Sequence, residues 1–317
     1  MSTAQPPARF SARAHQVVLR GLRSSLSTVW LMGKVMIPVY LGVGMLHKLG
    51  VLALLVPVFR PLMGLFGLPS EAALVLIGGY SMNIYAGIGA LAPLHPTAHQ
   101  VTVVGLMLGI SHSLIVEWVV LRQMGARASR ITLLRVIVSL ITGAAYNLLV
   151  GEGLHATSVA HPAVVSHQLH AGVSVIAALR EVALGCWTLT WKMVVIVTVI
   201  MIVLEAVKET GLFELIARRL APGTTRLRVS SDAIFPLAVG AFFGIIYGGG
   251  ALVQVGREGR LSRADVNSVA VFLSICHAIV EDTALFAILG ASWAVLVSIR
   301  LALAVSLTFL LRTRGWV

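Results

Sequence analysis

The sequence predicts an all-α polytopic membrane protein made of two inverted-topology repeats, each with three spanning helices and a re-entrant, glycine-broken hairpin. Composition, an internal repeat and the placement of basic residues lead to this fold class. Of the 317 residues, 58% are hydrophobic and 11% are charged, and the mean hydropathy is +0.94. A soluble domain carries about 25% charged residues. The composition therefore excludes a soluble globular enzyme and favours helical spans.

Apolar runs of about 20 residues give the elements in order. A basic amphipathic helix is expected at 10–26, on the inner membrane surface. Glycine-broken segments at 71–93 and 232–255 are expected to form the re-entrant hairpins. The expected full spans lie at 28–48, 100–121, 131–151, 187–207, 266–289 and 293–311.

The second half of the chain repeats the first. A shift of 161 places Trp30 on Trp191, and the same shift places Gly87 on Gly248. After a four-residue insertion in the second half, a shift of 165 places His112 on His277 and Glu117 on Asp282. Because special residues match as well as leucines, an internal repeat is predicted.

Basic residues indicate that both termini are cytoplasmic. With the N-terminus inside, the inner loops hold 17 of the 24 lysines and arginines, as the positive-inside rule requires. Each repeat then crosses the membrane an odd number of times, so the two repeats are inverted. Lys34, Arg135, Lys192 and Arg300 fall within spans near their ends, where long side chains are expected to snorkel. The net charge of +12 is thus explained without nucleic acid as a partner.

These patterns divide the chain into four parts. A basic cytoplasmic segment covers 1–27 and the first repeat covers 28–152. An outer, histidine-bearing loop with an amphipathic linker helix is expected at 153–186, and the second repeat covers 187–317.

The paired glycine-broken segments are the first candidate site. Non-helical backbone at membrane depth is tolerated where it lines a cavity or is buried in protein, and such pairs in inverted repeats point to a transport site. Close helix packing through small residues is the alternative. The predicted substrate-binding residues are Ser81, Asn83, Tyr85, Gly87, Gly89, Tyr247, Gly248, Gly249 and Gly250.

Ionisable residues inside apolar spans form the second candidate site. His112 and Glu117 lie in one span, and His277, Glu281 and Asp282 lie in another. Such groups are costly in lipid and usually face a cavity or a partner. A proton relay, a set of cation ligands and a polar lock between the repeats are the candidate roles. His277 and Glu281 are four residues apart and are expected to share a helix face.

Motifs for nucleotide hydrolysis, serine esterases and zinc proteases do not occur in the sequence. Catalysis is therefore not expected, and neither is a cofactor apart from a coupling cation or proton. Whether a metal binds is left open by these residues.

The motifs resemble those of the nucleoside-recognition, or Gate, domain family. The resemblance rests on a Trp-led span, the turn GLPSEAA, the glycine-rich segment around Asn83 and Tyr85, and the motifs SHSLIVEW and CHAIVEDT. It covers roughly residues 28–124 and 189–290. Gate domains occur in concentrative nucleoside transporters, in the membrane part of the ferrous iron transporter and in spore maturation proteins. The resemblance implies a pore-and-gate architecture in a stand-alone protein of the bacterial cytoplasmic (inner) membrane.

Two functions from different classes follow as expectations. The first is a transporter or channel that moves a small solute or ion through a site between the repeats. The second is a non-transporting membrane factor for lipid handling or assembly, like the spore maturation proteins. The expected partners are a small solute or ion, the lipid bilayer and a second copy of the chain in a homo-oligomer.

Overall fold

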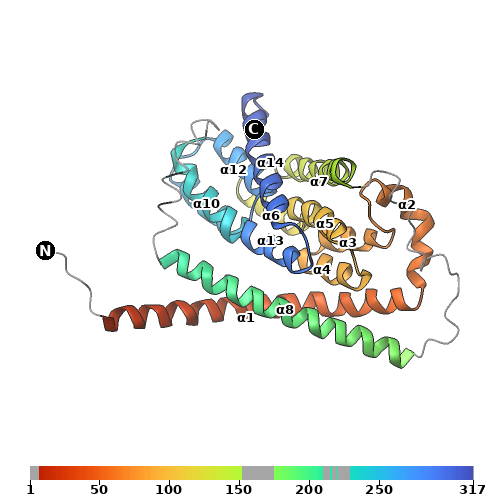
Figure 1. The fold of residues 1–317 in the computed structure, drawn as a ribbon. Coiled ribbons are helices and arrows are strands. Elements are labelled where there is room, and N and C mark those ends of the chain that lie inside the picture. The colour runs from red at the N-terminus through yellow and green to blue at the C-terminus, as the bar shows by residue number, and fades with distance from the viewer. Residues whose placement is uncertain (1–6, 152–174, 210–214, 216–218, 220–228, 317) are drawn as a thin grey trace.

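The computed structural model describes residues 7–151, 175–209, 215, 219 and 229–316 (Figure 1). Every regular element in this part of the chain is helical. The α-helices are α1 (Pro7–Lys48), α2 (Val56–Gly64), α3 (Ala72–Ser81), α4 (Ile84–Leu91), α5 (Ala98–Ile110), α6 (Leu114–Gln123), α7 (Ala128–Val150), α8 (Val175–Glu209), α10 (Ile234–Phe243), α11 (Ile245–Arg257), α12 (Arg263–Ile275), α13 (Ile279–Ile288) and α14 (Trp293–Thr313). Short 3₁₀ turns are η1 (Val51–Leu55), η2 (Ala92–Leu94) and η5 (Ser231–Ala233).

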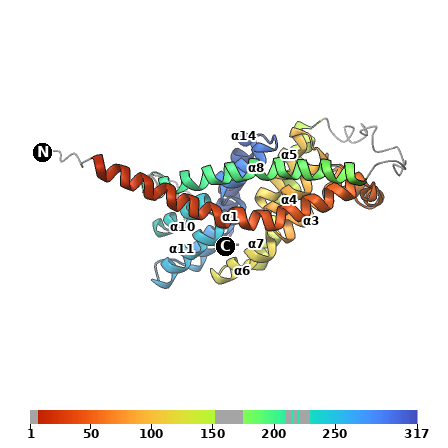
Figure 2. The ribbon, with the colours of Figure 1, turned by 90° about the horizontal axis from the view of Figure 1, so that it is seen from below.

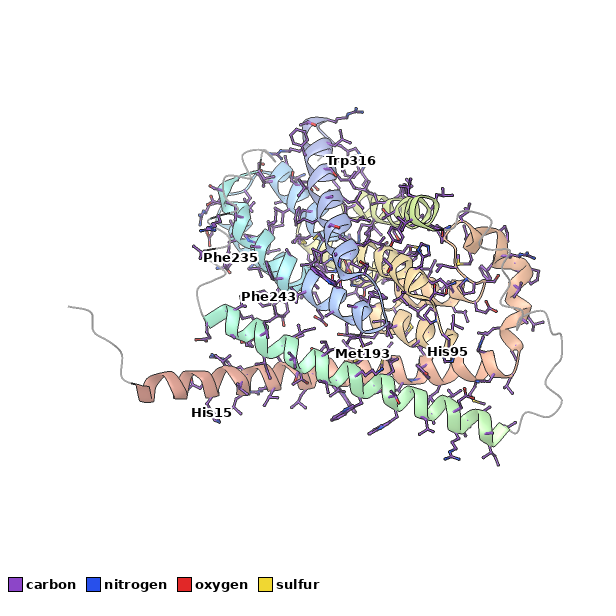
Figure 3. All side chains as sticks on the ribbon, viewed as in Figure 1. His15, His95, Met193, Phe235, Phe243 and Trp316 are labelled. Atoms are coloured by element: carbon purple, nitrogen blue, oxygen red, sulfur yellow. The ribbon has the colours of Figure 1, made fainter. Side chains whose placement is uncertain are left out.

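Six helical segments among the described residues are long and apolar enough to cross a membrane. They are His15–Lys48, Ala98–Gln123, Ala128–Val150, Val175–Glu209, Arg263–Ile288 and Trp293–Thr313. Exposed apolar side chains such as Phe235 on α10, labelled in Figure 3, suit a hydrocarbon surrounding. The all-α class with six candidate spans agrees with the prediction, whereas the predicted outer histidine-bearing loop lies mostly outside the described residues.

The long helices α1 and α8 cross each other along one side of the molecule, and the remaining helices lie together on the other side (Figures 1 and 2). Arg20 and Glu209 form an ion pair toward one end of this crossing. Lys48 and Glu181 form another toward the opposite end, with 2.7 Å between Nζ and Oε1. These pairs show that α1 and α8 run antiparallel.

Both long helices differ from the prediction in their continuity. The surface helix expected at 10–26 and the span at 28–48 form a single helix, α1. The linker helix expected within 153–186 joins the span at 187–207, and the described part of both is α8. Neither junction contains a proline, so the helical hydrogen bonds continue through it.

Two helical hairpins, α3–α4 and α10–α11, occupy the glycine-broken segments. The first hairpin turns at Asn83, whose Oδ1 accepts a hydrogen bond from the Ala86 amide (3.0 Å) and so caps α4. The second turns at Gly244, whose φ of 99° suits glycine. Asn83 and Gly244 are equivalent under the shift of 161, so both predicted interruptions fall at matching positions.

Two of the predicted spans are broken in the middle, whereas the sequence predicts them to be continuous. Residues 111–113 separate α5 from α6, and residues 276–278 separate α12 from α13. Ser113 and Ala278 take left-handed backbone conformations, with φ values of 49° and 44°. These two residues are equivalent under the shift of 165.

Each break is tied to a hairpin by the same kind of hydrogen bond. The Ser113 amide donates to the Gly79 carbonyl (3.0 Å), and the Ala278 amide donates to the Gly240 carbonyl (3.3 Å). These contacts recur at equivalent positions of the two halves. The helix breaks are therefore supported by neighbouring segments and lie within the protein.

Candidate functional site

The two helix breaks bring buried ionisable side chains together between the halves of the molecule. His112 and His277 lie in the breaks themselves, and their rings are 5.0 Å apart between centroids. Carboxylates from the following helices and arginines from α7 and α14 surround them. The buried charged residues of this centre are His112, Glu117, Arg135, His277, Asp282 and Arg300.

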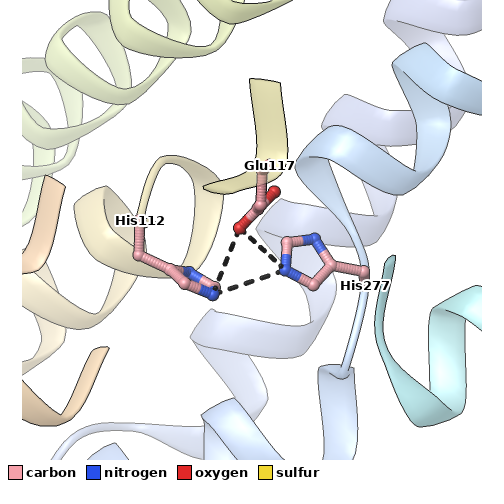
Figure 4. Close-up of side chains that lie close together, drawn as sticks. All are labelled: His112, Glu117 and His277. Atoms are coloured by element: carbon pink, nitrogen blue, oxygen red, sulfur yellow. Dashed lines mark hydrogen bonds and ion pairs between the residues drawn. The ribbon is translucent and has the colours of Figure 1, made fainter. Parts of the chain in front are cut away.

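The two histidines are held in matching orientations. The Nδ1 atom of His112 lies 2.8 Å from the Leu108 carbonyl oxygen, and that of His277 lies 2.7 Å from the Leu273 carbonyl oxygen. Because a carbonyl oxygen only accepts, Nδ1 carries the hydrogen in both rings. In each neutral ring, Nε2 therefore keeps its lone pair, and the two Nε2 atoms face each other at 3.4 Å (Figure 4).

Glu117 completes a triangle with these two nitrogens. Its Oε1 lies 3.5 Å from His112 Nε2 and 3.4 Å from His277 Nε2 (Figure 4). Its other oxygen, Oε2, lies 2.7 Å from Nη1 of Arg135. One half of the chain thus contributes a carboxylate and a histidine to the triangle, and the other half contributes the second histidine.

Arg135 and Arg300 correct the sequence interpretation. Both were expected to snorkel from within their spans, but both side chains are at most 1% exposed. The Nε atom of Arg135 donates to the Ile110 carbonyl (3.0 Å), and that of Arg300 donates to the Ile275 carbonyl (3.3 Å). Each guanidinium therefore satisfies a carbonyl that the helix break leaves free.

The same arginines also contact the histidine backbone. Nη2 of Arg135 donates to the His112 carbonyl (3.2 Å), and Nη2 of Arg300 donates to the His277 carbonyl (2.8 Å). Sequence reasoning did not place these arginines in the site. Their equivalence under the shift of 165, the shift that pairs the histidines, is the signal that identifies them.

The remaining predicted carboxylates occupy separate positions around the triangle. Asp282 is equivalent to Glu117 but is one methylene shorter, and its Oδ2 lies 3.1 Å from Nη2 of Arg300. Glu281 accepts a hydrogen bond from the hydroxyl of Tyr85 on α4 (2.7 Å), which joins the two halves. The helix face expected for His277 and Glu281 does not form, because His277 precedes the first residue of α13.

The polar residues predicted to bind substrate are mostly elsewhere. Ser81 is exposed and donates to the Ile77 carbonyl (2.6 Å), and Asn83 caps its helix. Tyr247 is 65% exposed, beside Lys208 on α8. Within the predicted substrate-binding set, Tyr85 contacts Glu281, one of the predicted coupling residues.

The predicted glycines fall inside regular helices, so the open backbone expected at Gly248, Gly249 and Gly250 is wrong. A Cβ at Gly87 would collide with Leu108, and one at Gly248 would collide with the Gly240 backbone. A Cβ at Gly89 would come within 2.8 Å of a backbone oxygen of α1. Close packing, the alternative weighed for these segments, accounts for these three glycines.

A small pocket of about 140 Å³ lies between α1, α8 and η2. None of the predicted binding residues lines it. Its lining residues are Tyr40, Gly44, Lys48, Pro93, His95, Glu181, Val182 and Gly185.

The six candidate spans and the buried ionic centre define a polytopic helical membrane protein. No family model matches the chain, and no solved structure matches it. The chain is 31% identical over 294 residues to the uncharacterized membrane protein YvoD of Bacillus subtilis (strain 168), a match that covers 92% of this chain and 93% of the relative. The chain belongs to the family of this membrane protein. The resemblance to Gate domains stays a prediction from the motifs.

Proposed function

We propose that this protein is a transporter of the bacterial cytoplasmic membrane. It moves a small ion or solute through the buried ionic centre between its two inverted repeats. The observation that carries this function is the meeting of two interrupted spans at a cluster of charged side chains. Ionisable residues at membrane depth are costly and mark substrate or ion pathways. Discontinuous helices at equivalent positions of two repeats are the typical setting of such a site.

Contacts between the halves support the inverted orientation. On the expected inner side, the Arg127 amide donates to Asn267 Oδ1 (2.9 Å). On the expected outer side, the Ser292 amide donates to Thr102 Oγ1 (3.0 Å). Segments assigned to the same side by their charges are thus neighbours. With this assignment α5–α6 runs inward and α12–α13 runs outward, as inverted repeats require.

The centre is closed to both sides in this structure. His112, the most exposed member of the triangle, is 8% exposed. Transport therefore needs an opening, and rocking of one repeat against the other is how such folds provide it. A non-transporting membrane factor would keep the same centre closed as a permanent polar lock, so opening of the centre distinguishes the two functions.

Native Cys276, directly before His277, reports this opening without knowledge of the substrate. In a Cys186→Ser background, we expect Cys276 to react with a membrane-impermeant thiol reagent while the folded protein is in native membranes. The complementary variant, Cys276→Ser, leaves only Cys186 and serves as the control, because this thiol is also buried but lies on α8 and not in a helix break.

The equivalent position in the first half is tested by Ser111→Cys in a background that lacks both native cysteines. If Cys276 or the Ser111→Cys variant is labelled in membranes while Cys186 stays unlabelled, the result supports transport. Labelling of both probes only after denaturation would contradict it and would identify a static lock.

A further inference from the structure

We propose that His112, Glu117 and His277 bind one divalent transition-metal cation, with a fourth coordination position left open, and that this cation is the cargo. The binding site stands on the geometry of the triangle. The assignment as cargo rests on the proposed transport function.

Three atoms with lone pairs converge in the triangle. None of the three carries a hydrogen atom that it could donate to the other two. The Nε2 atoms of both histidines are unprotonated in the neutral rings, because Nδ1 carries the hydrogen in each. Oε1 of Glu117 is the third atom, since a carboxylate oxygen only accepts. Such a set of acceptors is stable where a cation lies among them.

The size of the triangle fits a metal ion. Its sides are 3.4, 3.4 and 3.5 Å. A tetrahedral ion with ligands at about 2.0–2.1 Å separates neighbouring ligand atoms by about 3.3–3.4 Å. A shared proton would instead draw two of the three atoms to a hydrogen-bond distance of about 2.7–3.0 Å. Nearly equal sides therefore favour a metal ion over a proton.

The surroundings are those of a metal site. Metal-binding histidines usually donate their second ring N–H to a carbonyl or carboxylate, and ligating carboxylates are themselves hydrogen-bonded. Both histidines do the former, and Arg135 forms an ion pair with the remaining oxygen of Glu117. Next to the triangle, Arg300 pairs with Asp282, whereas Glu281 accepts a hydrogen bond from the Tyr85 hydroxyl.

The ligand types select the class of ion. Two imidazoles and one carboxylate suit Zn²⁺, Co²⁺, Fe²⁺ or Mn²⁺, whereas Ca²⁺ prefers six to eight oxygen ligands and Mg²⁺ an octahedron of oxygens. Three protein ligands leave one position of a tetrahedron for water or for a ligand of the next site on a pathway. The hydroxyl of Ser111, adjacent to His112, is buried without a hydrogen-bond partner among the described residues. It is available to a water on the ion.

Co²⁺ is the first probe, because its visible spectrum reports tetrahedral coordination. The full-length protein, purified in detergent and treated with a chelator, is titrated with Co²⁺ and then with Zn²⁺ in competition. We expect one equivalent of Co²⁺ with a tetrahedral spectrum, displaced by Zn²⁺ and not by excess Mg²⁺. Absence of stoichiometric binding to the wild-type protein overturns the metal site, whatever the variants do.

Variants of the ligands define the site. His112→Gln, His277→Gln and Glu117→Gln should each weaken Zn²⁺ binding by more than about 100-fold, since even outer-shell changes cost 10–100-fold. His99→Ala is the matched control, because it removes a histidine from α5, the helix that ends just before His112. An equal loss of Zn²⁺ binding in the control, or no loss in the ligand variants, would contradict the assignment of these three residues as metal ligands.

Transport is tested separately in proteoliposomes that contain a Zn²⁺-sensitive or a proton-sensitive dye. Zn²⁺ influx that is lost in His277→Gln and kept in His99→Ala supports the cation as cargo. If Zn²⁺ binds stoichiometrically, no Zn²⁺ enters the vesicles and Cys276 stays unlabelled, the metal site is supported and transport is refuted. Proton flux and an accessible Cys276 without any metal binding keep transport and overturn the metal inference.

Discussion

Arg135 illustrates how much one side chain can carry in this fold. It pairs with Glu117 and donates hydrogen bonds to carbonyls at the helix break. A buried ion pair is weak evidence for net stability, because desolvation of both charges offsets their attraction. Removal of one partner is different, because it leaves a buried charge without compensation. Arg135 therefore makes the break between α5 and α6 tolerable at membrane depth.

Arg135→Ala is expected to destabilise the protein by about 3–5 kcal/mol, the usual cost of breaking a buried ion pair. The measurement is the midpoint of unfolding in mixed detergent micelles. Arg130→Ala is the matched control, since Arg130 is an exposed cation on the same helix, α7. The double variant Arg135→Met/Glu117→Leu removes both charges and should recover part of the loss. If Arg135→Ala is as stable as Arg130→Ala, the ion pair between Arg135 and Glu117 is not needed for stability.

At the scale of the element, the glycines of the hairpins act through packing. Gly248 and Gly250 lie two residues apart on α11, yet their surroundings are opposite. A Cβ at Gly248 would collide with the backbone of Gly240 on α10, whereas one at Gly250 would meet nothing within 4 Å. The hairpin α10–α11 closes because one of these glycines lets the two backbones approach.

Gly248→Ala should therefore destabilise the protein by about 1–3 kcal/mol or more, the cost of overpacking. Gly250→Ala should be neutral or stabilising by about 0.5–1 kcal/mol, because alanine favours a helix over glycine. Thermal unfolding of the two variants in the same detergent compares them. Equal changes in stability for the two variants would mean that the hairpin shifts to accommodate the new Cβ. Gly248 would then not be required for close packing.

The hairpins also show what the sequence can predict at this scale. Interruptions within 71–93 and 232–255 were predicted, because glycine clusters in both segments match under one shift, but the second turn lies at Gly244 and not at Gly248–Gly250. The breaks at 111–113 and 276–278 were not predicted, because neither tripeptide, Ser-His-Ser or Cys-His-Ala, contains a glycine or a proline. They depend on hydrogen bonds from outside the helix, such as those of Arg135, and pattern analysis of one segment does not contain these partners.

The residues of the buried ionic centre could be identified from the sequence only in part. His112, Glu117 and His277 were singled out because ionisable residues inside apolar spans are costly. Their contact across the halves follows from the tertiary fold. Of the glycines predicted to bind substrate, Gly87, Gly89 and Gly248 lie at close contacts with neighbouring helices. Tyr85 reaches Glu281 without a counterpart in the other half, since the equivalent position holds Ile246.

For the whole molecule, the pattern of charges and the contacts between halves lead to one topology. Expected inner positions contact each other across the halves, as the Arg127 amide does Asn267 Oδ1 at 2.9 Å. Expected outer positions do the same, as the Ser292 amide does Thr102 Oγ1 at 3.0 Å. If each half crosses the membrane an odd number of times, loops at equivalent positions of the two repeats face opposite sides. The loop before α5 and the loop before α12 are such a pair.

This topology is tested by two exposed positions in those loops, each in a background without native cysteines. We expect Ala98→Cys, at the start of α5, to react with an impermeant thiol reagent added outside intact cells. Glu258→Cys, just after α11, should react only when the reagent reaches the inner face, as in inverted vesicles. Both side chains are exposed in the structure, so access alone decides the result. Reaction of both positions from the same side would refute the inverted repeats, and with them the alternating access on which the proposed transport depends.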